Sequence, residues 1–480
     1  MALPRDLDDA TKRQLQKENK QQKDSGGSEG TLMGWLESSS EVDVDNFLSI
    51  LQVLEDNKDD LKQTLNCCRA VIKFANNSIK VGRSEEWLKA TEQVLLNIDK
   101  YRSSLDFPKE EKIPFTDLYI AKFSCLKVRN NRNEEAKECL IQAIYLSSSC
   151  EEKIKAYLTL AQYYEDISEY NEMKNYLDKC EKLCQTKPIL ENYLAHVWLL
   201  LGHYYFFQFN FRLSLQNLTK ARTKLQSILN KTQNKTKESE WTYRRLSDCL
   251  HYIGRIYHEH YELVKAAEYY IEAQRILEEN QKNYFLAKEL GATAFYHLRL
   301  GQILEICQIT DGAMEHYNES RNFFSDGVSQ KDSKSDKSRI VSSGSVQVYL
   351  ALANMIKDAP TSQSKSYEQT LKKQEAQIKE AEEDSLKTGY YRGYLLALLQ
   401  LFWLYVRNLK FHLALPLVWK ALTSDEFKKS GGVLLLYRYA KKIIFGIFYK
   451  IRFLVWLKLH SDKVLYRCPC PIQHNKQYEK

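Results

Sequence analysis

Three stretches of the chain repeat one pattern, and this repeat constrains the fold more than any other feature of the sequence. Each copy sets a glycine inside a bulky apolar segment and follows it with a second segment that carries small residues. The copies are Trp198, Leu201, Gly202, Tyr205, Leu218 and Ala221; Leu250, Ile253, Gly254, Tyr257, Ala266, Tyr270 and Ala273; and His297, Leu300, Gly301, Leu304, Ala313, Tyr317 and Ser320. We interpret each copy as two antiparallel helices in which the glycine lets a bulky residue of the second helix sit close. Because such a pair cannot bury its apolar face alone, neighbouring pairs must stack into a solenoid.

Weaker copies extend the pattern in both directions. They contain Ala136, Leu140 and Ala143; Tyr157, Leu160, Ala161, Tyr164, Leu177 and Cys180; and Leu398, Leu401, Phe402, Tyr405, Ala414, Val418 and Ala421. The pattern resembles the tetratricopeptide repeat, which implies an all-α solenoid of antiparallel helix pairs with a right-handed superhelix. The small residues at 161, 202, 254 and 301 are 41, 52 and 47 positions apart. Since the family repeat is about 34 residues, the helices or their connections are longer here.

The composition divides the chain into six segments. We predict a disordered polar N-terminus over 1–30, a helical region over 31–114, and tetratricopeptide-like repeats over 115–325. A Ser/Lys/Asp-rich linker follows over 326–345, then C-terminal helical repeats over 346–426 and a basic aromatic tail over 427–480. Only 8 prolines and 17 glycines interrupt the 480 residues, which favours helix throughout.

The positive charge is concentrated at one end. The formal net charge is +8, and residues 427–461 alone contain eight Lys or Arg and no Asp or Glu. The last 19 residues add +2, so residues 1–426 carry about −2. The repeats therefore lack the basic surface that nucleic-acid binding requires, and no nucleic-acid partner is expected.

The polar N-terminus has no apolar run of the secretory type, and the 11 cysteines are expected to be reduced. These features predict a cytoplasmic or nuclear protein.

The tail is open to several interpretations. Residues 433–459 are long enough to span a membrane, but five basic residues interrupt them and Lys458 follows. Each would cost about 3 kcal/mol near the bilayer centre. The remaining alternatives are a basic aromatic helix on an anionic membrane surface, a last solenoid helix, and an alternative or truncated terminus.

No catalytic, cofactor-binding or metal-binding residues are predicted. The sequence contains no nucleophile motif, phosphate-binding glycine loop or His-Glu-x-x-His motif. Cys468 and Cys470 lie near His460 and His474, but Cys-Pro-Cys has the wrong spacing for a zinc knuckle. His251, His258 and His260 lack a further ligand at metal spacing. The chain is therefore expected not to be an enzyme.

The resemblance implies where a partner would bind, because the first helices of such pairs line the concave face of the solenoid. The predicted partner-binding residues are Gln162, Glu165, His203, Phe206, Arg255, His258, Gln302 and Glu305. This mixture of polar, aromatic and ionisable groups suits an extended peptide or a helix. The alternative is a solvated inner face, with binding through the edges of the solenoid.

We predict a non-catalytic protein–protein interaction scaffold or adaptor subunit of a larger complex. The long irregular repeats resemble those of cell-division scaffolds such as the cohesin-loader partner subunit or the separase arm, which implies a role in chromosome segregation. One alternative is a peripheral membrane or trafficking adaptor that uses residues 428–458, and another is the regulatory arm of an enzyme whose catalytic domain is absent. We expect protein partners and no small-molecule substrate.

Overall fold

The computed structural model of the chain describes ten continuous ranges and some single helical positions. The ranges are 64–72, 84–102, 114–126, 133–167, 169–187, 190–231, 237–281, 290–306, 391–407 and 410–424. Single positions are described between 312 and 322, between 369 and 386, and at 451 and 455. All regular structure within these residues is helical, which confirms the all-α prediction.

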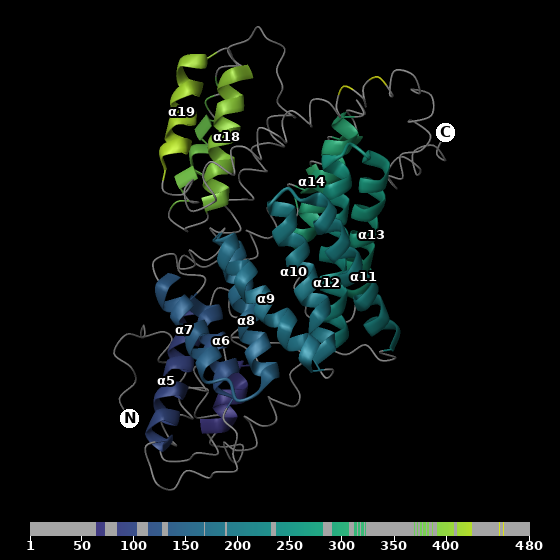
Figure 1. The fold of residues 1–480 in the computed structure, drawn as a ribbon. Helices are drawn as coiled ribbons and strands as arrows, with labels where there is room; N and C mark the ends of the chain where they lie inside the picture. Colours follow the sequence, from purple (N-terminus) through teal and green to yellow (C-terminus); the bar gives the residue numbers. More distant parts are fainter. Residues whose placement is uncertain are drawn as a thin grey trace, which may run out of the picture.

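From α5 to α14 the helices follow one another as neighbours in space, and α18 packs against α19 (Figure 1). Their bounds are α5 Ser84–Arg102, α6 Phe115–Leu126, α7 Asn133–Tyr145, α8 Cys150–Asp166, α9 Tyr170–Thr186, α10 Glu191–Phe207, α11 Phe211–Lys231, α12 Lys237–Glu259, α13 Leu263–Gln281, α14 Leu290–Ile306, α18 Tyr391–Arg407 and α19 Phe411–Thr423. The most extensive contacts join α6 to α7, α8 to α9, α10 to α11 and α12 to α13. We call α6, α8, α10, α12 and α14 the first helices, and their partners the second helices.

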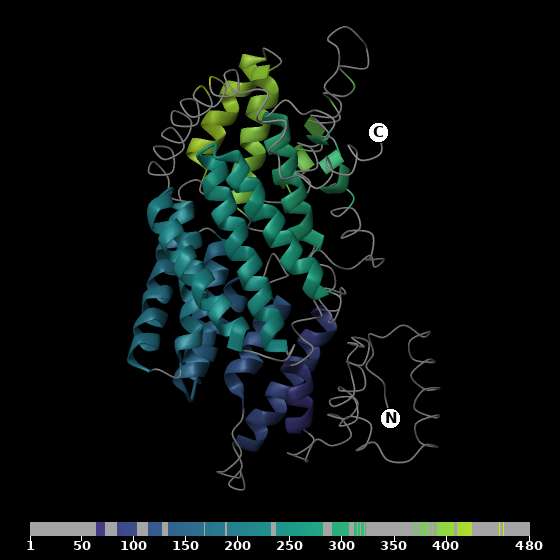
Figure 2. The ribbon, with the colours of Figure 1, turned by 90° about the vertical axis from the view of Figure 1, so that its right-hand side faces the viewer.

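Successive pairs stack so that each second helix also contacts the first helix of the next pair. The first helices also contact one another, α6 with α8, α8 with α10, and α10 with α12. The view in Figure 2 shows the same succession from purple to green along the molecule. The buried core therefore extends along the stack as a series of clusters and does not form one central mass.

Two glycines lie where the helices of a pair approach most closely. A Cβ atom on Gly202 would lie 2.5 Å from Cδ2 and 2.6 Å from Cγ of Leu218. On Gly254 it would lie 2.8 Å and 3.0 Å from two ring carbons of Tyr270. Any larger residue would force these helices apart, so the predicted role of both glycines is confirmed.

Four of the pairs also share one turn geometry. Between the two helices, a backbone N–H donates to the carbonyl of a tyrosine five residues earlier at 2.8–3.0 Å. The donors and acceptors are Glu169 and Tyr164, Asn210 and Tyr205, Glu262 and Tyr257, and Lys410 and Tyr405. In two of these turns Phe209 and Tyr261 adopt positive φ values of 54° and 57°. The four tyrosines are those of the sequence pattern. The repeated tyrosine therefore also marks where the first helix of these pairs ends.

The wide repeat spacing arises largely from longer helices. α11 has 21 residues and α12 has 23, and both extend into the polar stretch around residues 230–239. The predicted segment boundaries stay predictions. Residues 1–30 and 326–345 lie outside the described residues, as does 427–480 apart from Ile451 and Val455.

Candidate functional site

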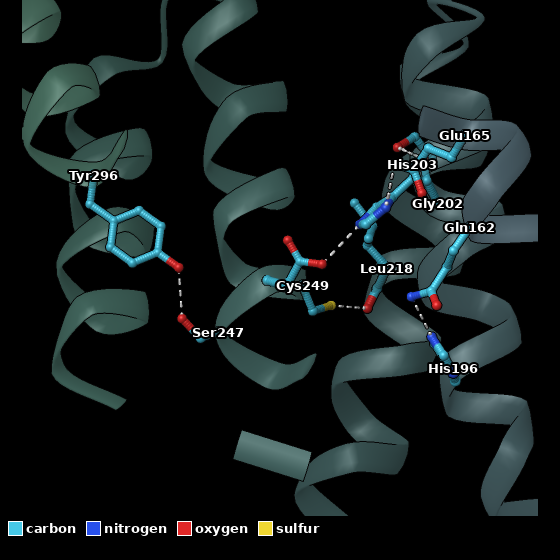
Figure 3. Close-up of polar contacts among 11 residues, drawn as sticks. Gln162, Glu165, His196, Gly202, His203, Leu218, Ser247, Cys249 and Tyr296 are labelled. Atoms are coloured by element: carbon cyan, nitrogen blue, oxygen red, sulfur yellow. Dashed lines mark hydrogen bonds and ion pairs between the residues drawn. The ribbon is translucent and has the colours of Figure 1, made fainter. Parts of the chain in front are cut away.

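The site is built from the first helices, which carry polar side chains toward one another. On α8, Gln162 and Glu165 are three residues apart, so they lie on the same face one turn from each other. On α10, His196 and His203 are seven residues apart and share the face toward α8. The side-chain nitrogen Nε2 of Gln162 lies 3.3 Å from Nε2 of His196. This contact joins the first helices of two neighbouring pairs (Figure 3).

His203 links three first helices. Its Nδ1 lies 3.1 Å from Oε1 of Glu165 on α8, and its Nε2 lies 3.5 Å from Oδ2 of Asp248 on α12. The ring stacks on Tyr252 with centroids 3.8 Å apart. We call Glu165, His203 and Asp248 the His203 bracket.

The ionisation of His203 reflects two opposing effects. Burial alone would lower the pKa of the imidazole. The carboxylates of Glu165 and Asp248 outweigh burial and raise the pKa above its usual value. His203 therefore stays protonated to a higher pH in the folded protein than in the unfolded chain.

An arginine and two aromatic rings continue this face. The guanidinium carbon of Arg255 lies 4.3 Å from the ring centroid of Phe206 and 4.9 Å from that of Tyr252. Phe206 is 5% exposed. The arrangement is a cation–π contact across α10 and α12, which holds the two helices together.

The structure brings together four of the predicted partner-binding residues as two contacts, Glu165 with His203 and Phe206 with Arg255. The others lie apart: Gln162 contacts His196, His258 packs edge-on to Tyr270, and Gln302 accepts a hydrogen bond from Arg299. The side chain of Glu305 lies outside the described residues. Because His203 and Phe206 are buried between helices, part of the predicted groove is filled by the chain itself. Partner binding by these eight residues stays a prediction.

The sequence reasoning missed His196, Asp248 and Tyr252. The seven-residue spacing from His203 could have placed His196 on the same face. Asp248 and Tyr252 reach His203 only because α12 stacks beside α10, which no local spacing reveals.

The cysteines behave as packing residues. Burial raises the pKa of the Cys67 and Cys68 thiols to about 12 and that of Cys184 to about 11. The buried Cys249 donates from Sγ to the carbonyl oxygen of Leu218 at 3.0 Å, linking α12 to α11 (Figure 3). These thiols stay protonated at neutral pH, which disfavours nucleophilic or metal-binding roles for them.

Neither a metal cluster nor a membrane span is found within the described ranges. No group of three or more His, Cys, Asp or Glu side chains there is placed to hold a metal ion. None of the helices described is both long and apolar enough to cross a bilayer. The Cys468 and Cys470 pair and most of the basic 428–458 segment lie outside the described residues.

Comparisons with known proteins add little beyond this geometry. No protein-family profile matches the chain, and no curated protein does. A STAND signal-transduction ATPase with a tetratricopeptide repeat sensor from Pyrococcus horikoshii is 16% identical, with a TM-score of 0.36 over 87% of this chain and 55% of that protein. The chain thus spans about half the length of that protein.

Two further solved structures are similar at the same low level. The APC/C hetero-tetramer Cut9–Hcn1 is 12% identical, with a TM-score of 0.31 over 85% of this chain and 68% of that chain. A circular tandem repeat protein with a novel repeat topology is 13% identical, with a TM-score of 0.22 over 85% and 90%. Such scores carry no functional argument, so the fold assignment rests on the chain's own helix packing. With glycines at the closest approach in two pairs and one turn geometry shared by four, the chain is an all-α helical-repeat solenoid whose repeat resembles the tetratricopeptide pattern.

Proposed function

We propose that the chain is a non-catalytic scaffold or adaptor that presents its solenoid to protein partners in a larger complex. The observation that carries the proposal is the row of first helices, which places charged, amide and aromatic side chains from α8, α10 and α12 along one face. An extended surface of this kind suits a peptide or helix of a partner. The raised thiol pKa values of Cys67, Cys68 and Cys184 are in keeping with a protein that acts by binding.

The proposed cellular process rests only on the length and irregularity of the repeats. We propose that the complex acts in chromosome segregation or cell division, in the cytoplasm or the nucleus. The support is the resemblance of the long irregular repeats to those of large cell-division scaffolds. Imaging of the tagged chain through the cell cycle tests this assignment, and a distribution confined to membranes at every stage contradicts it.

Co-purification tests the scaffold itself. The full chain is tagged in its native cells, purified in two affinity steps and analysed by mass spectrometry with size-exclusion chromatography. We expect at least one protein in a fixed ratio to the chain, eluting with it as a complex. Recovery of the chain alone, as a monomer, contradicts the proposal.

A second candidate function is favoured by the surface of α19. Its side chains Phe411, Leu415 and Trp419 are 52%, 67% and 71% exposed. They precede the segment 427–461, whose eight basic residues are unaccompanied by acidic ones. An apolar helix followed by basic residues suits an anionic membrane surface. Flotation with vesicles containing phosphatidylserine should then show salt-sensitive binding that neutral vesicles lack.

A further inference from the structure

Arg245 on α12 is a half-buried cation without an acidic partner within the described residues. Its guanidinium lies over the ring of Trp241, 4.9 Å from the centroid. Its Nε atom is buried and has no acceptor, and no ion pair to Arg245 occurs in the described part of the chain. Burial lowers the pKa of the guanidinium to about 10. A buried guanidinium N–H without an acceptor is unfavourable, and such groups in proteins are usually hydrogen-bonded.

A second unsatisfied polar group lies nearby on α10. His196 is 5% exposed, and its Nδ1 atom is buried without a hydrogen-bond partner. Burial, followed by the nearby charge of Arg245, lowers the pKa of His196 well below its usual value, so the ring is neutral. With the Gln162 amide nitrogen donating to Nε2, the ring proton resides on Nδ1. Nδ1–H is then a donor that no described residue uses.

The carboxylate of Glu151, which contacts the neighbouring Tyr193, is engaged by other groups. Tyr193, one turn before His196 on α10, is close enough to Arg245 for the two to influence each other's pKa. Its hydroxyl donates to Oε1 of Glu151 at 2.8 Å, and the same oxygen lies 3.5 Å from Nζ of Lys155. The neighbouring Arg244 adds further positive charge. Arg245 and His196 therefore supply two donors, Nε and Nδ1–H, for which no described residue is the acceptor.

We propose that Arg245 and His196 form a binding site for an oxyanion carried by a protein partner, either an acidic side chain or a phosphorylated one. Carboxylate and phosphate oxygens accept charge-assisted hydrogen bonds from arginine and would satisfy the histidine donor. The two residues lie on α10 and α12, first helices that contact each other. This proposal rests on the proposed function, and it adds that the group recognised on the partner is an oxyanion.

The test uses the full chain with three variants. Arg245→Gln removes the proposed contact, Arg245→Lys keeps the charge but loses the fork geometry, and Arg244→Gln is the control. Arg244 is the exposed neighbour on the same helix, so the control removes the same charge from nearly the same place. Thermal unfolding is followed while sodium phosphate replaces sodium chloride at constant ionic strength.

We expect phosphate to raise the melting temperature of the wild type and of Arg244→Gln by similar amounts, beyond its general salting effect. In Arg245→Gln the apparent affinity for phosphate should fall at least about tenfold. The affinity of Arg245→Lys should lie between those of the wild type and Arg245→Gln. Without phosphate, Arg245→Gln should be as stable as the wild type or more so, because it removes a buried N–H group that has no acceptor. Equal phosphate responses in all variants, or a marked loss of stability in Arg245→Gln alone, overturns the site.

Labelled peptides distinguish the two sources of the oxyanion. Fluorescence anisotropy compares a glutamate-rich peptide, its glutamine counterpart and a phosphoserine version. The glutamate or the phosphoserine peptide should bind more tightly than the glutamine peptide, and Arg245→Gln should remove that preference. A preference that survives Arg245→Gln unchanged contradicts the site.

Co-purification with the same variants separates this inference from the proposed function. If the wild type recovers a partner and Arg245→Gln recovers it equally, the oxyanion site is wrong and the scaffold stands. If the wild type recovers no partner, the scaffold is wrong, and the phosphate titration still decides whether the site exists.

Discussion

At the scale of single residues, two kinds of side chain set the packing: glycines that admit a neighbour and ionisable groups held between helices. Gly202 and Gly254 contribute to packing because they have no side chain. Leu218 and Tyr270 occupy the space where a Cβ atom would be. His203 acts in the opposite way, because it draws two carboxylates from neighbouring helices toward itself.

Gly202→Ala is expected to destabilise the protein by about 1–3 kcal/mol through overpacking against Leu218. This loss exceeds the gain of up to about 1 kcal/mol that alanine brings to a helix. Urea unfolding followed by circular dichroism measures the difference. Asn192→Ala, at an exposed position on the same helix, should change stability by less than about 0.5 kcal/mol. A Gly202→Ala protein as stable as the wild type contradicts the close approach.

The His203 bracket predicts a pH dependence of defined sign. Because the folded pKa is raised, its stabilisation is full below the unfolded pKa of about 6.5 and is lost as the pH rises through the folded value. The stability difference between the wild type and His203→Asn should therefore be larger near pH 6 than near pH 8.5, as measured by urea unfolding. A difference that does not change with pH argues against a charged His203.

His297 provides the control of opposite sign. Burial lowers its pKa to about 4, and its Nδ1 lies 2.9 Å from Nδ1 of His316. A neutral folded histidine gives full stability above about pH 6.5 and loses it as the pH falls toward 4. His297→Asn should therefore lessen the loss of stability in acid, whereas His203→Asn should not.

At the scale of helices, buried side chains that donate to backbone carbonyls join neighbouring helices. Thr116 donates to Ala143, Ser214 to Gly202, Cys249 to Leu218 and Ser247 to Ala273, at 2.7–3.2 Å. Each donor is small enough to lie in the interface, and each acceptor is a carbonyl of the facing helix. Such bonds fix the position of one helix along the axis of the other. Apolar packing alone defines this position less closely.

Ser247 connects three helices and is the most informative of these donors. Its hydroxyl donates to the carbonyl of Ala273 on α13 and accepts from the hydroxyl of Tyr296 on α14, each at 2.8 Å. Ser247→Ala should destabilise the protein by about 1–3 kcal/mol, because it leaves a buried hydroxyl and a carbonyl unsatisfied.

A double-mutant cycle with Tyr296→Phe measures the coupling. The double variant should lose less than the sum of the two single losses. Additive losses indicate that the two hydroxyls do not interact.

The same scale shows what the sequence could predict. The glycines and turn tyrosines were found because they belong to a local pattern, in which Gly202 and Tyr205 lie within one turn of each other. Contacts between pairs were not found, because His203 and Asp248 are 45 residues apart and meet only through stacking. The predicted inner-face residues were placed on the right helices by resemblance, but their burial depends on how closely α8, α10 and α12 approach.

At the scale of the molecule, each helix pair contacts chiefly its neighbours, so stability should vary along the stack. The pair α18–α19 illustrates this difference. Its buried side is formed by Ala397, Leu401, Leu404 and Ala414 together with Ile378, whereas much of α19 is exposed.

Substitutions in this pair should separate buried positions from exposed ones. Leu401 is fully buried, so Leu401→Ala should reduce the stability of the pair by about 2–5 kcal/mol. Leu415→Ser and Trp419→Ser should change it by less than about 0.5 kcal/mol, since both side chains are already exposed. Hydrogen exchange of α18 amides reports both effects, and a large loss in Leu415→Ser shows that the face is covered within the chain.

The His203 bracket also has a mechanical meaning. In a stack of helix pairs joined only by apolar contacts, the angle between neighbouring pairs could change at each junction. The bracket attaches α8, α10 and α12 to one another through a single side chain, so three pairs would move as one stiff segment. A force that a partner applies to one end of this segment would be transmitted to the other end. The contacts of His203 with Glu165 and Asp248 would be the ones that break under that force.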